Sequence, residues 1–229
     1  KKIRMLESMF HVSSPTQIYK HWLNALLYYI YRHKTVDPAS LQNRLYNLAC
    51  SFMLDVYVAK EKKDFESIVY GNDEFLPSNK IDDIDWNQIN CGCNVQNFIF
   101  NFYDFVTWYE NPTKYPKFEF TYRTSVEHFY PQNPMPGYED LKDRGLDNFG
   151  NLCLISRGMN SKFSNNMPKA KLDNFGLIDE VRNGLSLKLL EMMDYVKNKG
   201  NWSEKQIKVF DDHSRNMFLK AFNRLVKQF

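Results

Sequence analysis

The sequence lacks several features that would place a protein in a well-defined class. It has no run of about 18 apolar residues, so no membrane span is predicted, and it has no signal-peptide pattern. Only four cysteines are present. Cys91 and Cys93 are too close for the usual zinc knuckle and no second pair exists, so no structural zinc is expected. Cys50 and Cys153 lie in apolar runs and are predicted to be buried free thiols, which fits a cytoplasmic protein.

The chain also has little excess charge. A net charge of +3 permits a nucleic-acid partner without indicating one, because a polyanion binds a local basic patch. Apolar residues make up 43% of the 229 residues, which predicts a globular chain with one large domain or two small ones. The chain starts at Lys1, and residues 1–10 already resemble part of an element. We therefore expect a fragment of a longer protein.

Residues 1–116 are predicted to form a helical region. A capping box at residues 14–17 precedes a face with apolar residues four apart, and Asp37-Pro38 opens a second helix. Residues 70–92 are predicted to be a loop. Residues 94–110 carry an aromatic stripe, which at helical spacing indicates core more strongly than a surface for stacking bases. The first face consists of Ile18, Trp22, Leu26 and Ile30, flanked by Leu23 and Leu27.

Residues 117–170 are predicted to form a ββα unit. Residues 117–130 are rich in aromatic and β-branched side chains, which is typical of a strand, and a loop with three prolines follows. Residues 152–156 are a second short strand and residues 159–166 a short helix. The chain then returns to helices at 171–229, with a capping box at 203–206 and the last helix running to about Phe229. The fold class is mainly α (α+β), with helices enclosing the ββα unit.

The ββα unit carries residues suited to phosphodiester hydrolysis. His128 can deprotonate water, because imidazole titrates near neutral pH. Glu127 and Asn160 supply oxygen ligands for Mg²⁺ or Mn²⁺. Asn151 precedes the second strand and is predicted to orient the imidazole of His128. Taken singly, each residue is more often structural: Asn151 suits a turn and Asn160 a helix cap.

Basic residues concentrate around the same unit. Residues 142–171 have a net charge of +4, more than the whole chain, which suits a phosphate backbone. Asp143 and Asp147 are the only acidic residues in this stretch. We expect phosphate or DNA contacts from Arg157, Lys162, Asn165 and Lys169.

The order of these motifs resembles the HNH, or His-Me finger, nucleases. A closer similarity is to the C-terminal nuclease domain of the GmrS–GmrD type modification-dependent restriction endonucleases. The matching residues are Glu127-His128 with Pro131-Gln132, then Gly150-Asn151-Leu152, then Asn160-Ser161 with Ser164-Asn165, and Trp202 before a basic helix. The specific similarity covers about 45 residues. Zinc-bound cysteine pairs of some relatives are missing here, and Lys162 follows Asn160 by two positions where the wider pattern often has three.

The resemblance implies a metal-dependent endonuclease that acts on foreign, often modified, double-stranded DNA. It also implies an N-terminal nucleotide-hydrolysing domain as partner, and this chain contains no phosphate-binding glycine loop of that kind. The alternative is a helical DNA-binding or protein-interaction module that keeps the scaffold without turnover. A purely structural helical domain is a third reading, and it leaves the basic cluster and the motif order unexplained.

Overall fold

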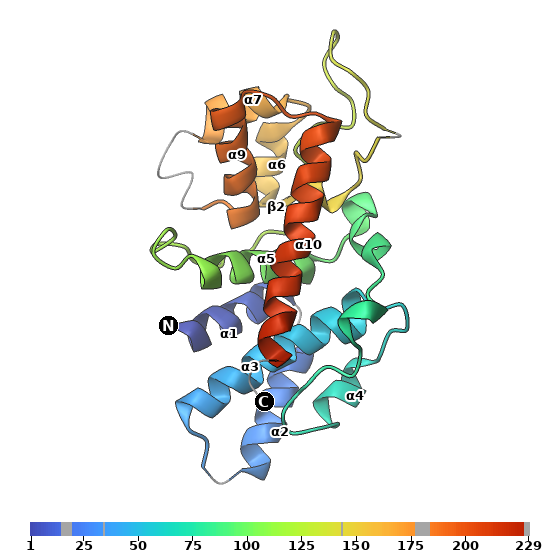
Figure 1. Ribbon diagram of the computed structural model, residues 1–229. Helices are drawn as coiled ribbons and strands as arrows, with labels where there is room; N and C mark the ends of the chain where they lie inside the picture. The colour runs from blue at the N-terminus through green and yellow to red at the C-terminus, as the bar shows by residue number, and fades with distance from the viewer. Residues whose placement is uncertain (15–19, 34, 143, 177–183, 227–229) are drawn as a thin grey trace. The chain divides into compact units, whose positions relative to one another are not determined.

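The computed structural model describes residues 1–14, 20–33, 35–142, 144–176 and 184–226 (Figure 1). The fold is mainly helical with one two-stranded sheet, as the sequence predicted. The α-helices are α1 (Lys2–Ser13), α2 (His21–Arg32), α3 (Pro38–Ser51), α4 (Phe65–Val69), α5 (Asn97–Glu110), α6 (Arg157–Phe163), α7 (Pro168–Lys171), α9 (Leu187–Lys199) and α10 (Glu204–Val226). The strands are β1 (Ser125–His128) and β2 (Leu152–Ile155).

Shorter helical segments connect these elements. π-helical turns span Phe52–Tyr57 and Leu172–Gly176. The 3₁₀ turns span Ile81–Asp83, Trp86–Ile89, Gly92–Asn94 and Phe149–Asn151. Residues 70–92, predicted to be a loop, contain several of these turns and no longer helix among the residues described. None of the described helices has the length and hydropathy that a membrane span needs.

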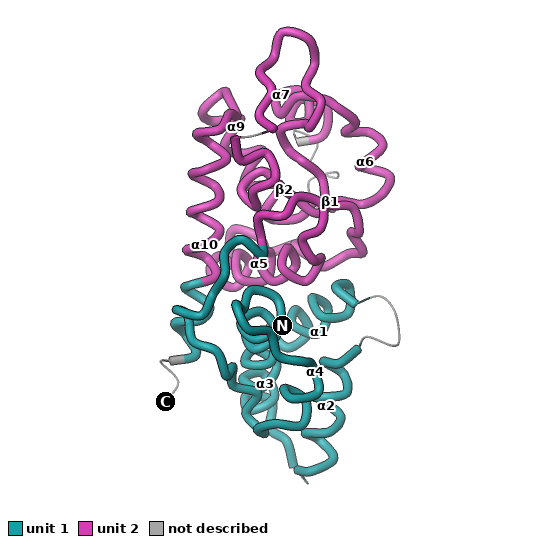
Figure 2. The backbone as a smooth tube through the Cα atoms, turned by 90° about the vertical axis from the view of Figure 1, so that its right-hand side faces the viewer, with its two compact units in different colours: residues 1–88, 219–229 teal, residues 89–218 magenta. Residues whose placement is uncertain are grey.

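The chain divides into two compact units, coloured separately in Figure 2. Unit 1 contains residues 1–88 and 219–229, and unit 2 contains residues 89–218. The composition had suggested a break after residue 116. Helix α5 instead belongs with the hairpin, because Phe100 and Tyr103 pack on Phe149, with ring centroids 4.9 and 6.1 Å apart.

Unit 1 is a helical assembly in which α1 packs on α3 and α2 on α4. Asp37 caps α3 by accepting from the backbone N–H groups of Ala39 and Ser40, as the Asp-Pro motif predicted. The core contains stacked rings of Phe10 and Trp22, with centroids 5.5 Å apart. The capping box proposed at residues 14–17 lies mostly outside the described residues, as does Ile18.

The buried face of α2 differs from the prediction. Trp22 and Leu26 are buried as expected, but Leu27 and Ile30 are 57% and 43% exposed. Ala25 and Tyr29 complete the buried stripe instead. A strict spacing of four exceeds the 3.6 residues of one helical turn, so a row of such residues drifts off the core face.

Unit 2 is built around the hairpin of β1 and β2. Helices α5 and α9 pack against each other and against β2, while α6 lies against β1 and α7 against α9. Figure 2 shows α6 beside β1, with α9 on the other side of the hairpin. The predicted aromatic stripe of α5 is core, since Phe98, Phe102 and Phe105 are at most 3% exposed. The apolar face of α9 is confirmed by buried Leu189, Met192, Met193 and Val196.

The strand predicted over 117–130 is much shorter in the structure. Only Ser125–His128 pair with β2, and residues 117–124 form no regular element. Within this segment, Arg123 bonds the turn before α9 and lies near α5. Buried Arg123 donates from Nε and Nη2 to the carbonyl of Gly184, 3.1 and 3.0 Å away, and lies 3.9 Å from the Asp104 carboxylate of α5. This network fixes the approach to β1.

The last helix begins as predicted. Ser203 donates its backbone N–H to Gln206 Oε1 at 3.1 Å, which is the reciprocal arm of the predicted capping box. Helix α10 is described to Val226, so its predicted end at Phe229 lies outside the described residues. Its first part belongs to unit 2 and its last part to unit 1.

Candidate functional site

The hairpin places Glu127 and His128 at the end of β1. The strands are antiparallel, with Glu127 opposite Cys153 and His128 opposite Leu152. Phe129 donates its backbone N–H to the carbonyl of Asn151 at 2.8 Å, which closes the hairpin just beyond the pair. Consecutive side chains of a strand point to opposite faces, and Glu127 and His128 have different partners, Lys171 and Asp147.

The imidazole of His128 has a partner on each side. Nε2 lies 2.7 Å from Asp147 Oδ1, and Nδ1 lies 3.9 Å from Cys93 Sγ. A carboxylate only accepts hydrogen bonds, so we assign the proton to Nε2. Nδ1 then keeps its lone pair for another donor. The side chain of His128 is 5% exposed and that of Asp147 is 56% exposed, so the imidazole lies beneath an exposed carboxylate.

A glycine allows Asp147 to reach the imidazole. Gly92 has φ +59°, and a Cβ added there would lie 2.8 Å from Asp147 Oδ1. The backbone N–H of Gly92 also donates to the Asp147 carbonyl at 3.1 Å. Phe149, two residues after Asp147, donates its N–H to Asn90 Oδ1 at 2.9 Å. The turn at residues 90–92 therefore holds the segment that carries Asp147.

The imidazole of His128 lies between the Cys93 thiol and the Asp147 carboxylate, which is also the arrangement of a cysteine nucleophile with its base. Partial burial raises the pKa of the Cys93 thiol, and the carboxylates of Asp147 and Glu127 raise it further. A catalytic cysteine needs the opposite shift, because the thiolate is the nucleophile. Cys93 is therefore a thiol at neutral pH and serves as a weak hydrogen-bonding neighbour of Nδ1.

Glu127 is paired with a buried cation. Its Oε1 lies 2.9 Å from Lys171 Nζ, and this lysine has no exposed side-chain surface. Lys171 also donates to the carbonyls of His128 and Phe129, at 2.7 and 3.1 Å. The Glu127 side chain remains 16% exposed, and its Oε2 makes no hydrogen bond with the described residues. One carboxylate oxygen is thus held by the fold and the other is available.

The side-chain amide of Asn151 bonds groups other than the imidazole that it was predicted to orient. Its Oδ1 accepts from the backbone N–H of Tyr130 and from Trp202 Nε1, at 2.8 and 3.1 Å. Its Nδ2 donates to the carbonyls of Tyr130 and Leu146. The amide is fully buried, and both its oxygen and its nitrogen are engaged by these bonds. Asn151 fastens the loop between the strands, and Asp147 orients the histidine.

Gly150, which precedes Asn151, is required for packing. A Cβ at this position would lie 2.1 Å from the carbonyl oxygen of Ile207 and 2.6 Å from the backbone nitrogen of Asp211. The 3₁₀ turn that precedes β2 therefore touches the backbone of α10. This close approach brings Asn151 within reach of Trp202, which stands just before that helix.

The remaining predicted site residues lie on and after α6. Ser156 caps this helix through the Met159 N–H, and Asn160 is exposed without a hydrogen bond to its side chain from the described residues. Arg157 and Lys162 are also exposed, and neither forms an ion pair in the described part of the chain. Lys169 is paired with Asp173 at 3.0 Å, and Asn165 lies next to the Ser164 hydroxyl.

The donor set around β1 contains few acidic or imidazole groups. Within the described residues, no group of three or more His, Cys, Asp or Glu side chains has the geometry of a metal site. The hard oxygen donors near the hairpin include the free Oε2 of Glu127, the carboxylate of Asp147 and the amide of Asn160, which is on the helix that lies against β1.

Sequence reasoning missed Asp147, Lys171 and the Asn151–Trp202 hydrogen bond. Asp147 entered only as a charge opposing the basic cluster, and Lys171 only as one of its members. No local pattern marks either residue, because each has a partner that is distant in the sequence, 19 and 44 residues away. The signal for Trp202 was its position before the last helix.

One family model matches this chain. It is described as the C-terminal domain of GmrSD restriction endonucleases, and it matches residues 85–218, which is more than half of the chain. The matched residues nearly coincide with unit 2. No curated protein and no solved structure matches the chain.

Proposed function

Because the chain belongs to the family of GmrSD restriction endonuclease C-terminal domains, we propose that it is a metal-dependent nuclease module that hydrolyses phosphodiester bonds of double-stranded DNA. The catalytic unit is the ββα element of β1, β2 and α6, used as a His-Me finger. The observation that carries this proposal is the oriented imidazole of His128, beside a carboxylate with one available oxygen.

His128 is the general base. With Nε2 bonded to Asp147, the lone pair of Nδ1 accepts a proton from water, and the Asp147 carboxylate stabilises the imidazolium that forms. The thiol of Cys93 occupies the side of the ring from which the water approaches. This thiol is a weak donor with a second acceptor, the carbonyl of Val126 at 3.7 Å, so it does not commit the lone pair of Nδ1.

Glu127 and Asn160 would hold the metal ion. Mg²⁺ keeps several waters and usually takes one or two carboxylates plus substrate phosphate, so one carboxylate oxygen and one amide fit its needs. The free Oε2 of Glu127 and the exposed amide of Asn160 meet this description. The bound ion would screen the phosphoryl charge and stabilise the leaving 3′ oxygen. Lys171 keeps the other oxygen of Glu127 fixed.

Arg157 and Lys162 contact the DNA backbone in this proposal. Both are on α6 and exposed, and neither is neutralised by an acidic partner among the described residues. Asn165 and Lys169 extend the same surface, with Lys169 released from Asp173 when phosphate binds. From the family membership we also propose a nucleotide-hydrolysing partner domain and the recognition of modified bases.

A DNA-binding module without turnover is the second candidate. The observation that favours it is the Glu127–Lys171 ion pair, which already neutralises the carboxylate that the metal needs. Such a module would bind duplex DNA with the same affinity with or without a divalent cation.

The test is cleavage of supercoiled plasmid by the 229-residue chain, with Mg²⁺, with Mn²⁺ and with a chelator, on unmodified and modified DNA. Hydrolysis is expected only with a divalent ion. Asn160→Ala should raise the metal concentration needed for half-maximal rate, whereas Asn166→Ala, a nearby asparagine bonded to the Lys162 carbonyl, should not. Binding without cleavage under every condition would favour the second candidate.

A further inference from the structure

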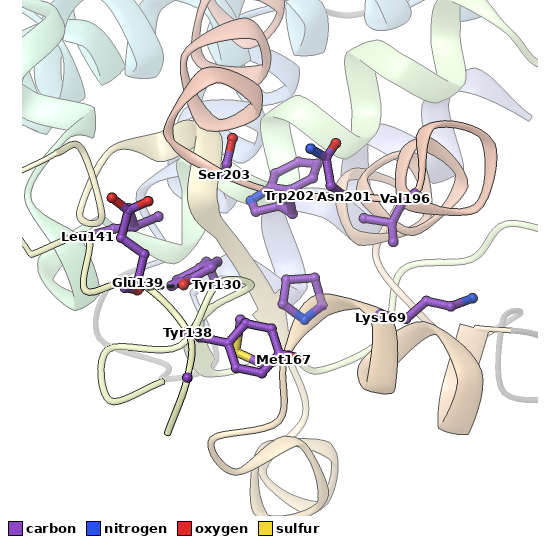
Figure 3. Close-up of a pocket in the computed structure, with 13 residues that line it drawn as sticks. Tyr130, Tyr138, Glu139, Leu141, Met167, Lys169, Val196, Asn201, Trp202 and Ser203 are labelled. Atoms are coloured by element: carbon purple, nitrogen blue, oxygen red, sulfur yellow. Dashed lines mark hydrogen bonds between the residues drawn. The ribbon is translucent and has the colours of Figure 1, made fainter. Parts of the chain in front are cut away.

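A pocket of about 450 Å³ lies in unit 2, beside the candidate active site. It is formed by the loop that leaves β1, by the start of α7, and by the turn between α9 and α10. Figure 3 shows Tyr130, Tyr138 and Trp202 around this cavity, together with Glu139, Met167 and Lys169. Its volume is in the range of pockets that hold small organic ligands.

The floor of the pocket is rigid and aromatic. Trp202 is 6% exposed and donates Nε1–H to Asn151 Oδ1 at 3.1 Å. Its ring packs on Phe129 and Phe210, with centroids 4.9 and 4.8 Å away. Tyr130 is 4% exposed, and its hydroxyl donates to the carbonyl of Glu139 at 2.6 Å. Both rings are therefore held in place by hydrogen bonds or ring contacts at the floor of the pocket.

The rim is polar and open. Tyr138 is 57% exposed and stands at the edge of this pocket. The space in front of Gly137 and Gly200 is empty, since a Cβ at either position would meet no atom within 4 Å. Glu139 and Lys169 place one carboxylate and one ammonium at the mouth; each is more than half exposed and forms an exposed ion pair, with Arg144 and Asp173 respectively.

The pocket and the candidate active site share one framework. Tyr130 follows His128 by two residues, and Lys169 precedes Lys171, the partner of Glu127, by two. Asn151 bonds both the backbone of Tyr130 and the indole of Trp202. A ligand in the pocket is therefore held by the same segments that hold the general base and the proposed metal ligand.

The floor of the pocket is aromatic, and its mouth carries a carboxylate that accepts hydrogen bonds and an ammonium that donates them. This combination suits a flat heteroaromatic ring with polar edges. We propose that this pocket receives one nucleotide extruded from the duplex, with its base against Trp202 and Tyr138. The inference rests on the proposed DNA substrate. In it, the pocket determines the position on the duplex at which the module binds. Enzymes that extrude a base pay the least for one that is already unpaired.

The test compares two labelled duplexes by fluorescence anisotropy in the presence of a chelator, where no cleavage occurs. One duplex is fully paired, and the other has a single nucleotide opposite an abasic site. The wild-type chain should bind the second duplex about tenfold more tightly, which is the size of one base–aromatic stacking contact. Tyr138→Ala should abolish the difference, and Tyr122→Ala, an exposed tyrosine of unit 2 outside the pocket, should retain it.

A second variant fills the pocket instead of opening it. Asn201→Trp places a large side chain at the exposed mouth and should also equalise the two affinities. Thermal unfolding confirms that each variant is folded. Equal affinities in the wild-type chain, or an unchanged difference in both Tyr138→Ala and Asn201→Trp, would overturn the proposal.

A deoxynucleoside monophosphate, titrated by calorimetry, separates the two sources of such a base. Binding of the monophosphate that Asn201→Trp removes, with no preference between the duplexes, would mean a free nucleotide site and would contradict extrusion. Plasmid cleavage is measured separately. A retained duplex preference without Mg²⁺-dependent cleavage counts against the proposed hydrolysis, whereas cleavage without the preference counts against the pocket.

Discussion

His128 Nε2 and Asp147 Oδ1 are 2.7 Å apart, although 19 residues separate them in the chain. The contact joins the end of β1 to the segment that precedes β2. It fixes the tautomer of the imidazole, so that Nδ1 is the basic nitrogen. The carboxylate is half-exposed and contributes little to the core. The main role of the Asp147 carboxylate is therefore to orient the histidine.

Asp147→Asn should lower the rate of Mg²⁺-dependent plasmid nicking by about 10–100-fold, the usual effect of losing a group that orients a catalytic residue. Asp147→Glu should retain more activity, because it keeps a carboxylate acceptor. Neither change should shift the thermal midpoint appreciably. Asp140→Asn, an exposed acidic residue of the same loop, is the matched control. Equal rates for Asp147→Asn and the control would remove Asp147 from the mechanism.

Lys171→Met should destabilise the chain by about 3–5 kcal/mol, because it leaves Glu127 without its ion-pair partner in a largely buried site. It also leaves two carbonyls without the Nζ donor. Lys169→Met removes an exposed ion pair with Asp173 and should cost less than about 1 kcal/mol. Urea denaturation measures both values. Adding Glu127→Gln to Lys171→Met should recover part of the loss, and full additivity of the two changes would contradict the coupling.

Gly150→Ala should destabilise the chain by about 1–3 kcal/mol or more, because its Cβ would stand 2.1 Å from the Ile207 carbonyl oxygen. The turn would move away from α10 and strain the Asn151–Trp202 hydrogen bond. Gly158→Ala is the control, since a Cβ there meets no atom within 4 Å and alanine favours the helix by about 0.5–1 kcal/mol. Similar unfolding midpoints for both variants would show that the close approach is unimportant.

Asp104 should make stability depend on pH between about 4 and 6. Burial raises the pKa of this carboxyl to about 6, and Arg123 only partly opposes the rise. The folded chain therefore holds a proton that the unfolded chain loses near pH 4, so this contribution is complete below that pH and disappears as pH rises through 6. Relative to Asp104→Asn, the wild-type free energy of unfolding should fall by about 3 kcal/mol across the window. A difference that is constant with pH would contradict the buried, protonated state.

Local chemistry was enough to predict much of the fold. The Asp37 cap, the buried face of α9 and the start of α10 at Ser203 were each written in a few adjacent residues. The length of the first strand could not be predicted in this way. Aromatic and β-branched residues predicted a strand over 117–130, but a strand needs a partner, and β2 offers only Leu152–Ile155.

The candidate site was predictable only in part. The order of the motifs predicted a role for Glu127, His128 and Asn160, and β1 and α6, which carry them, lie against each other. The partners of these residues depend on tertiary contacts that no spacing rule encodes. Asn151 was assigned to the imidazole because a hairpin places it opposite β1, yet the buried amide is used fully by Tyr130, Leu146 and Trp202.

The most direct measurement compares His128→Ala with His33→Ala in plasmid cleavage and in duplex binding at saturating Mg²⁺. His33 is a partly exposed histidine of unit 1, far from the hairpin in the sequence. We expect His128→Ala to lose cleavage by at least about 100-fold, the scale of general-base catalysis, while it binds DNA like the wild type. His33→Ala should cut normally. Cleavage by His128→Ala at the wild-type rate would contradict the assignment of the imidazole as the base.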